Sequence, residues 1–166
     1  LDVDGHATLQ AGTGGLAIHN VSAGGLTATG ASITQTGTAS VAGRADLLTG
    51  GDITLADFSA GLLDADAAAI TQTGTLTVTG VAKLDSPGAI ALANVTAGAL
   101  DVTTANQLQI AGGTVTGDAV LSAATSMTLS NLGAGSITAA AAALGVSGLT
   151  VGTDATLTSR AAALSL

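Results

Sequence analysis

The sequence predicts an all-β fold, a right-handed parallel β-helix of about nine turns with about 18 to 19 residues in each turn. A block of 37 residues repeats along the chain, and a fixed period of this size is typical of stacked repeat architectures. Within each block, apolar and polar residues alternate with the period of a β-strand. One column of equivalent positions holds Leu16, Ile53, Ile90, Met127 and Leu164.

The first predicted strand of each block has the pattern Val-x-Gly-x-Ala-x-Leu. Apolar or very small residues at every second position predict one buried face, so Val78 is expected to point inward. The intervening positions vary, from His6 to Arg44 and Val81, and are expected to face solvent. These strands are residues 3–9, 41–47, 78–84, 115–121 and, with threonine in place of the glycine, 151–157.

A second, shorter strand follows and ends at a polar corner. At an Asn or Asp, the alternation of inward-pointing residues shifts by one position, which indicates a corner. These residues suit a corner because they tolerate left-handed backbone and bond nearby backbone groups. We expect them to form a structural corner ladder, and the glycines four residues later to turn a second corner. The short strands are 16–18, 53–55, 90–92 and 127–129, the ladder residues are Asn20, Asp57, Asn94 and Asn131, and the corner glycines are Gly24, Gly61, Gly98 and Gly135.

The 37-residue block divides into two turns of the chain, because pairs of inward residues begin in alternating steps of 19 and 18 residues. Stacked turns bring each strand beside its copy, about 4.8 Å away. Residues 1–166 are therefore expected to form a single β-helical segment, a piece of a longer array, whose apolar ends at Leu1 and Leu164 favour end-to-end association. The steps run from Leu26 to Ala45, Leu63 and Ala82.

The composition predicts a narrow core and argues against several partners. Of the residues, 47% are hydrophobic but only 1% aromatic, with 24 glycines and no cysteine, so small side chains must fill the space between closely spaced strands. A net charge of −8 with only 3 basic residues argues against nucleic acid, whose phosphates need Lys and Arg. No apolar run approaches the roughly 20 residues of a membrane helix, so no membrane insertion is expected.

The chain is not expected to be an enzyme or to hold a cofactor or metal. His6 and His19 are the only imidazoles, and neither has a candidate partner at a defined spacing. A weak surface ion held by Asp64, Asp66 and Asp101 is less favoured than a solvated acidic face. Three amides share one register and predict stacking inside the helix or at its edge: Gln35, Gln72 and Gln109.

Two segments resemble a known kind of repeat. Residues 49–55 (TGGDITL) and 70–78 (ITQTGTLTV) look like filamentous haemagglutinin-type repeats. Such repeats belong to large bacterial exoproteins exported by two-partner secretion, including adhesins and the stalks of contact-dependent inhibition toxins. The resemblance implies a structural shaft that is secreted or held at the bacterial cell surface. Its partners would be neighbouring repeats of the same long chain and, through the parent protein, a host-cell receptor or other bacterial cells.

Two other functions remain open for a β-helix of this composition. One is an autotransporter-type passenger with a carbohydrate-binding or hydrolase groove, although the bases Arg44, Lys83 and Arg160 are far apart in the sequence. The other is an ice-binding β-helix, because threonines alternate along residues 71–79. A flat ice-binding row needs threonine at the same place on every turn, and the row is expected to break at residues 108–112.

Overall fold

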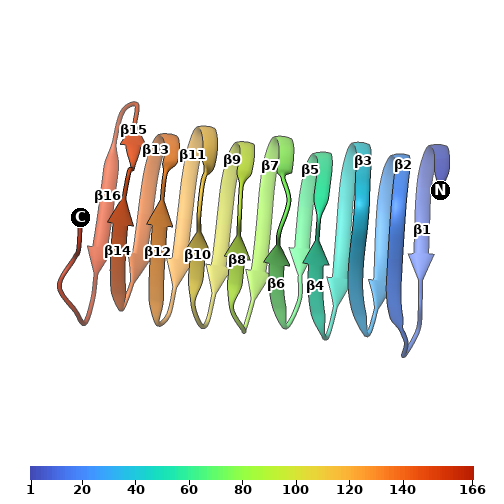
Figure 1. Ribbon diagram of the computed structural model, residues 1–166, viewed down its shortest axis with the longest axis horizontal. Helices are drawn as coiled ribbons and strands as arrows, with labels where there is room; N and C mark the ends of the chain where they lie inside the picture. The colour runs from blue at the N-terminus through green and yellow to red at the C-terminus, as the bar shows by residue number, and fades with distance from the viewer.

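The computed structural model describes residues 1–166 as one stack of β-coils without any helix (Figure 1). In Figure 1 the chain climbs the near side of the stack and descends the far side as it advances toward the C-terminus, which makes the coil right-handed. All neighbouring strands pair in parallel, and the predicted β-helix of about nine turns is confirmed. The chain has no helix that could cross a membrane.

The coils are built from 16 strands that belong to one continuous hydrogen-bonded sheet. The strands are β1 (Asp2–Gln10), β2 (Gly15–Gly30), β3 (Ser32–Thr49), β4 (Asp52–Leu55), β5 (Asp57–Asp66), β6 (Ala69–Gln72), β7 (Leu76–Ser86), β8 (Ile90–Leu92), β9 (Val95–Thr104), β10 (Leu108–Ile110), β11 (Gly113–Ala123), β12 (Ser126–Ser130), β13 (Leu132–Ala141), β14 (Ala143–Ser147), β15 (Thr150–Val151) and β16 (Ala155–Ser159).

Each coil has three faces joined by three corners. In the coil that begins with β4, the first face is β4 itself, and β5 supplies the second and third faces because it bends near Gly61. The second face of this coil is residues 57–60 and the third is residues 62–66. A strand pairs with the same face of the coils before and after it, as β6 does with β4 and β8.

The bend divides the predicted Val-x-Gly-x-Ala-x-Leu strand between two faces. In β7 the register of the pairing with β9 shifts between Val78 and Val81, and Gly80 lies in this bend. The predicted strand is therefore continuous within β7, but it bends at its glycine instead of running straight. The predicted directions of the side chains are nevertheless confirmed, because Val78 is 1% exposed and Val81 is 45% exposed.

The core of the third face alternates in side-chain size from coil to coil. Leu63 pairs with Ala82 of the next coil, and Ala65 pairs with Leu84. All four residues are buried, and large side chains beside small ones fill the space at high density. A coil of the Leu-x-Ala class thus alternates with a coil of the Ala-x-Leu class. Val102 takes the alanine position in one coil, and Ile137 takes the leucine position in another. This alternation gives a physical reason for a sequence repeat of two coils.

The second face follows the same rule with valine and alanine, whereas the first face carries mostly large residues such as Ile53, Ile70 and Ile90. The buried apolar residues of all three faces form one cluster along the stack. The alternating column of the second face contains Val41, Ala60, Val78, Ala97, Val115 and Ala134 in register.

Two glutamines interrupt the apolar first face. Gln35 and Gln72 are buried, and the Oε1 atom of each accepts a backbone N–H of the next first-corner segment, at 2.8 Å and 3.0 Å respectively. Gln109 does not share this register, so the expected row of three amides is wrong. Leu108 and Ile110 take the inward positions, and Gln109 faces solvent because this strand begins one residue later than the 37-residue count predicts.

Candidate functional site

The first corner of alternate coils is closed by an Asn or Asp side chain that reaches the next coil. Oδ1 of Asn20 accepts the N–H of Thr38 at 3.1 Å, and Oδ1 of Asp57 accepts the N–H of Thr75 at 2.8 Å. Each bond crosses from one coil to the next. The side chain satisfies a backbone donor at a bend where the regular ladder of the sheet is interrupted.

The coil that receives each of these side chains has glycine at its corner. A Cβ atom added to Gly37 or Gly74 would collide with Oδ1 of Asn20 or Asp57. Asn20 has φ of 49° and Gly37 has φ of 70°, a region that Asn and Gly adopt more readily than other residues. From coil to coil, this corner therefore alternates between an Asn or Asp and a glycine that leaves room for its side chain.

The two later ladder residues differ in how far they follow this arrangement. Asn131 does, since its φ is 50° and its Oδ1 lies where a Cβ on Gly148 would be. Asn94 instead bonds through its backbone, donating its N–H to Oε1 of Gln72 at 3.3 Å and accepting the N–H of Leu76 at 2.9 Å. All four ladder residues thus lie at the same corner, and one coil without such a residue separates each from the next: Asn20, Asp57, Asn94 and Asn131.

The corner glycines of the second bend form a column in which successive backbones approach closely. A Cβ on Gly61 would come within 2.7 Å of the Ala42 carbonyl oxygen and 2.9 Å of the Gly43 carbonyl oxygen. None of the four predicted corner glycines has a positive φ. The close approach of the neighbouring backbone, rather than left-handed backbone, therefore explains why glycine occupies these positions. The predicted glycines Gly24, Gly61, Gly98 and Gly135 all lie in this column, with Gly43, Gly80 and Gly117 between them.

Hydroxyl groups at the third corner are structural residues that the sequence interpretation missed. The hydroxyl of Thr49 donates to the Gly30 carbonyl at 2.8 Å and accepts the N–H of Gly51 at 3.1 Å. Ser86 makes the same pair of bonds, at 2.8 Å and 3.1 Å. The signal was present in the sequence, because Thr49 and Ser86 are 37 residues apart and each precedes a glycine by two positions.

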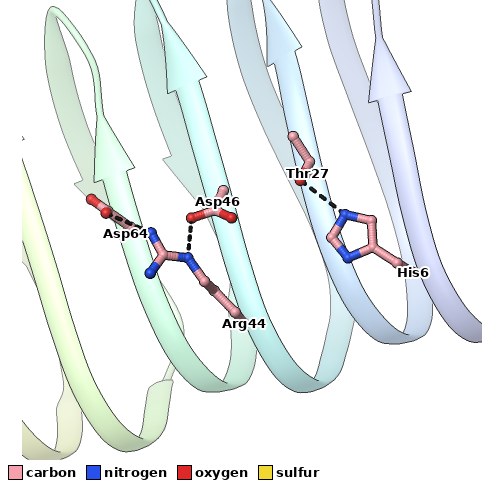
Figure 2. Close-up of polar contacts among 5 residues, drawn as sticks. All are labelled: His6, Thr27, Arg44, Asp46 and Asp64. Carbon is pink, nitrogen blue, oxygen red and sulfur yellow. Dashed lines mark hydrogen bonds and ion pairs between the residues drawn. The ribbon is translucent and has the colours of Figure 1, made fainter.

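The outward side of the third face carries the one charged cluster with ion pairs (Figure 2). Arg44 contacts Asp46 of its own coil at 2.5 Å and Asp64 of the next coil at 2.9 Å. The hydrogen bond to Asp46 and the charge of Asp46 raise the pKa of the Arg44 guanidinium further above its usual value, with a smaller contribution from Asp64. The cluster bridges two coils and stays open to solvent.

The same face brings together charges that are distant in the sequence. Lys83 pairs in register with Asp64 on one side and with Asp101 on the other. Arg44 and Lys83 thus flank Asp64, although the sequence interpretation treated the basic residues as separate. An open hollow of about 310 Å³ is lined by Asp46, Asp64 and Lys83, among others.

Neither histidine lies in a cluster that suggests catalysis or metal binding. Nε2 of His6 contacts the Thr27 hydroxyl at 2.9 Å (Figure 2), and Nδ1 of His19 contacts the Thr36 hydroxyl at 3.1 Å. Both contacts join neighbouring coils on the surface. No group of three or more His, Cys, Asp or Glu side chains is arranged to hold a metal ion.

A row of hydroxyl groups runs along the outward side of the second face. Thr77 of this face pairs with Thr96 of the next coil, so the row continues there. Thr71 lies instead on the first face, where its partner in the next coil is Ala91. Shallow hollows of about 350, 270 and 160 Å³ lie along it. The row contains Ser22, Ser40, Ser59, Thr77, Thr96 and Thr114 on six successive coils.

A family model described as repeats of unknown function (DUF5649) matches residues 4–59 and 57–97, which together are more than half of the chain. The chain belongs to this family. In this member, the DUF5649 repeats fold as stacked solenoid coils with alternating corners and an alternating core. No curated protein and no solved structure matches the chain.

Proposed function

We propose that this DUF5649 segment is a rigid shaft in a large secreted or cell-surface bacterial exoprotein of the adhesin type. The observation that carries the proposal is the continuity of the stack. Each coil pairs with the next on all three faces, and one apolar core runs along it. Such a structure holds its two ends at a fixed separation, which is the task of a shaft.

The connections between strands also support a structural role. The longest, residues 11–14, has four residues, and the others are shorter. Sites for ligands are commonly built on longer loops that a rigid scaffold positions. Here the corners instead carry Asn, Asp, Ser and Thr side chains that bond one coil to the next. The resemblance to filamentous haemagglutinin-type repeats supports the secreted or surface location.

Two measurements test the proposal, one for the shaft and one for the location. Duplicating residues 56–92 should lengthen the particle by about 10 Å, two coil spacings, without widening it in small-angle scattering. An antibody raised against the segment should label intact cells that make the parent protein. A particle that widens contradicts the shaft, and labelling that requires permeabilised cells contradicts the location.

Ice binding is a second candidate, favoured by the hydroxyl row of the second face. The row places one Ser or Thr on each of six successive coils. Ice binding predicts thermal hysteresis that Ser59→Leu and Thr77→Leu abolish, whereas a shaft predicts none in either form. Measurement of freezing-point hysteresis on the purified segment separates the two functions.

A further inference from the structure

Because large and small core residues alternate from coil to coil, the coil at each end of the stack can be assigned to the Leu-x-Ala or the Ala-x-Leu class. In the last coil, Ala155 pairs with Ile137 and Leu157 pairs with Ala139 of the coil before. This coil is of the Ala-x-Leu class. Its strand β16 pairs only with β13, so its other edge is free, and Ala155 is exposed.

The first coil has the same class. Ala7 pairs with Leu26, and Leu9 pairs with Ala28 of the coil that follows. Strand β1 pairs only with β2. Both free edges therefore present a small side chain followed by a large one on the third face.

We propose that each free edge is an interaction surface for a parallel β-coil of the Leu-x-Ala class, and that it discriminates against coils of the Ala-x-Leu class. The docking coil places a large residue beside Ala155 or Ala7 and alanine beside Leu157 or Leu9. Such a coil would continue the interface between coils inside the chain, where the two classes alternate with Val102 as the one residue that replaces alanine.

The second face selects a docking coil of the same class. Its column alternates valine and alanine, and Val151 pairs with Ala134 at one end while Val3 pairs with Ala23 at the other. A coil that continues the pattern has alanine beside each of these valines. Two faces thus select the same partner independently.

A second copy of this chain does not provide a coil of the Leu-x-Ala class at either end. Stacked end to end in register, two copies would place Ala7 beside Ala155 and Leu9 beside Leu157. The first pair leaves a cavity and the second is overpacked, and both defects are destabilising. The proposal therefore predicts a monomeric segment, in contrast to the end-to-end association expected from its apolar ends.

The test appends one coil to the C-terminus of the full chain. Leu166 lies three 37-residue repeats after Leu55, so a copy of residues 56–72 continues the chain in phase and brings its Leu63-x-Ala65 onto the last coil. The control is the same extension carrying Leu63→Ala and Ala65→Leu within the copy. The two extensions have identical length, composition and charge, and differ only in where the large residue lies.

The matched extension is expected to raise the melting temperature at least about 3 °C above that of the control extension. Hydrogen exchange should show protected amides in the matched extension and unprotected amides in the control. Equal melting temperatures and equal protection overturn the proposal, whether both extensions dock or neither does. Oligomers of the unextended chain in sedimentation, with protected end strands, overturn it too. None of these outcomes depends on where the protein works, so they test the edges independently of the proposed shaft.

Discussion

Oδ1 of Asp57 lies in the space that a side chain on Gly74 would occupy, one coil further along the stack. The same oxygen accepts the N–H of Thr75 at 2.8 Å. The polar corner of one coil is thus completed by the glycine corner of the next. Together with the alternating core, this contact makes two consecutive coils the structural unit.

Gly74→Ala is expected to lower the free energy of unfolding by about 1–3 kcal/mol, because the new methyl group is overpacked against Asp57 and the Ala56 carbonyl. Gly50→Ala is the control, since nothing lies within 4 Å of a Cβ there. Urea-induced unfolding measures both. The cost of Gly74→Ala should fall in an Asp57→Ala background, and equal costs in the two backgrounds contradict the contact.

Val78→Asp is expected to destabilise the protein by several kcal/mol, because the carboxylate would enter the core without a partner. Val81→Asp should change stability by only about 0.5 kcal/mol, since this side chain is 45% exposed. Thermal unfolding followed by circular dichroism compares the two variants. Similar losses of melting temperature refute the assigned inward and outward directions.

Leu63→Ala is expected to cost about 2–5 kcal/mol through loss of contacts and the cavity left behind. Ala82→Leu should cost about 1–3 kcal/mol by overpacking. Because Leu63 and Ala82 are partners in register, the double variant should lose less than the sum of the two. Leu62→Ala, at a side chain that is 43% exposed, is the control. Strict additivity in urea unfolding argues against the alternating core.

Arg44→Ala is expected to lower the melting temperature only slightly, because the side chains of its ion pairs with Asp46 and Asp64 are 36–55% exposed. The difference should disappear in 1 M NaCl, where the screening length is about 3 Å. A large loss that persists in high salt means that Arg44 contributes to stability by packing instead of charge.

The fold could be predicted from the sequence because the two-residue alternation within strands and the 37-residue repeat are both regular. Alternation within residues 78–84 was enough to assign Val78 and Val81 to opposite sides, and the 37-residue count placed Asp57 at a corner. What the count missed is the single extra residue before Leu108, which moved Gln109 to the surface. An insertion of one residue in a corner leaves the pattern of the strands unchanged, so the strand pattern does not reveal it.

The contacts between coils were less predictable than the coils themselves. Asp57 meets Gly74 and Arg44 meets Asp64 because the coil length brings residues 17 to 20 apart into contact. That length varies by up to three residues, from 20 between Ile33 and Ile53 to 17 between Ile53 and Ile70. Such a change moves a side chain to a different neighbour. The alternation of leucine and alanine was visible in the sequence, but its meaning depends on which residue of the next coil lies beside it.

Whether two coils form the unit is tested most directly by comparing the thermal unfolding of two deletion variants. Deleting residues 56–92 removes two coils and keeps coils of opposite class in contact. Deleting residues 56–72 removes one coil and stacks Ala82 on Ala45 and Leu84 on Leu47. The longer deletion is expected to give the higher melting temperature, although it leaves the shorter chain. A higher melting temperature for the single-coil deletion would contradict the two-coil unit.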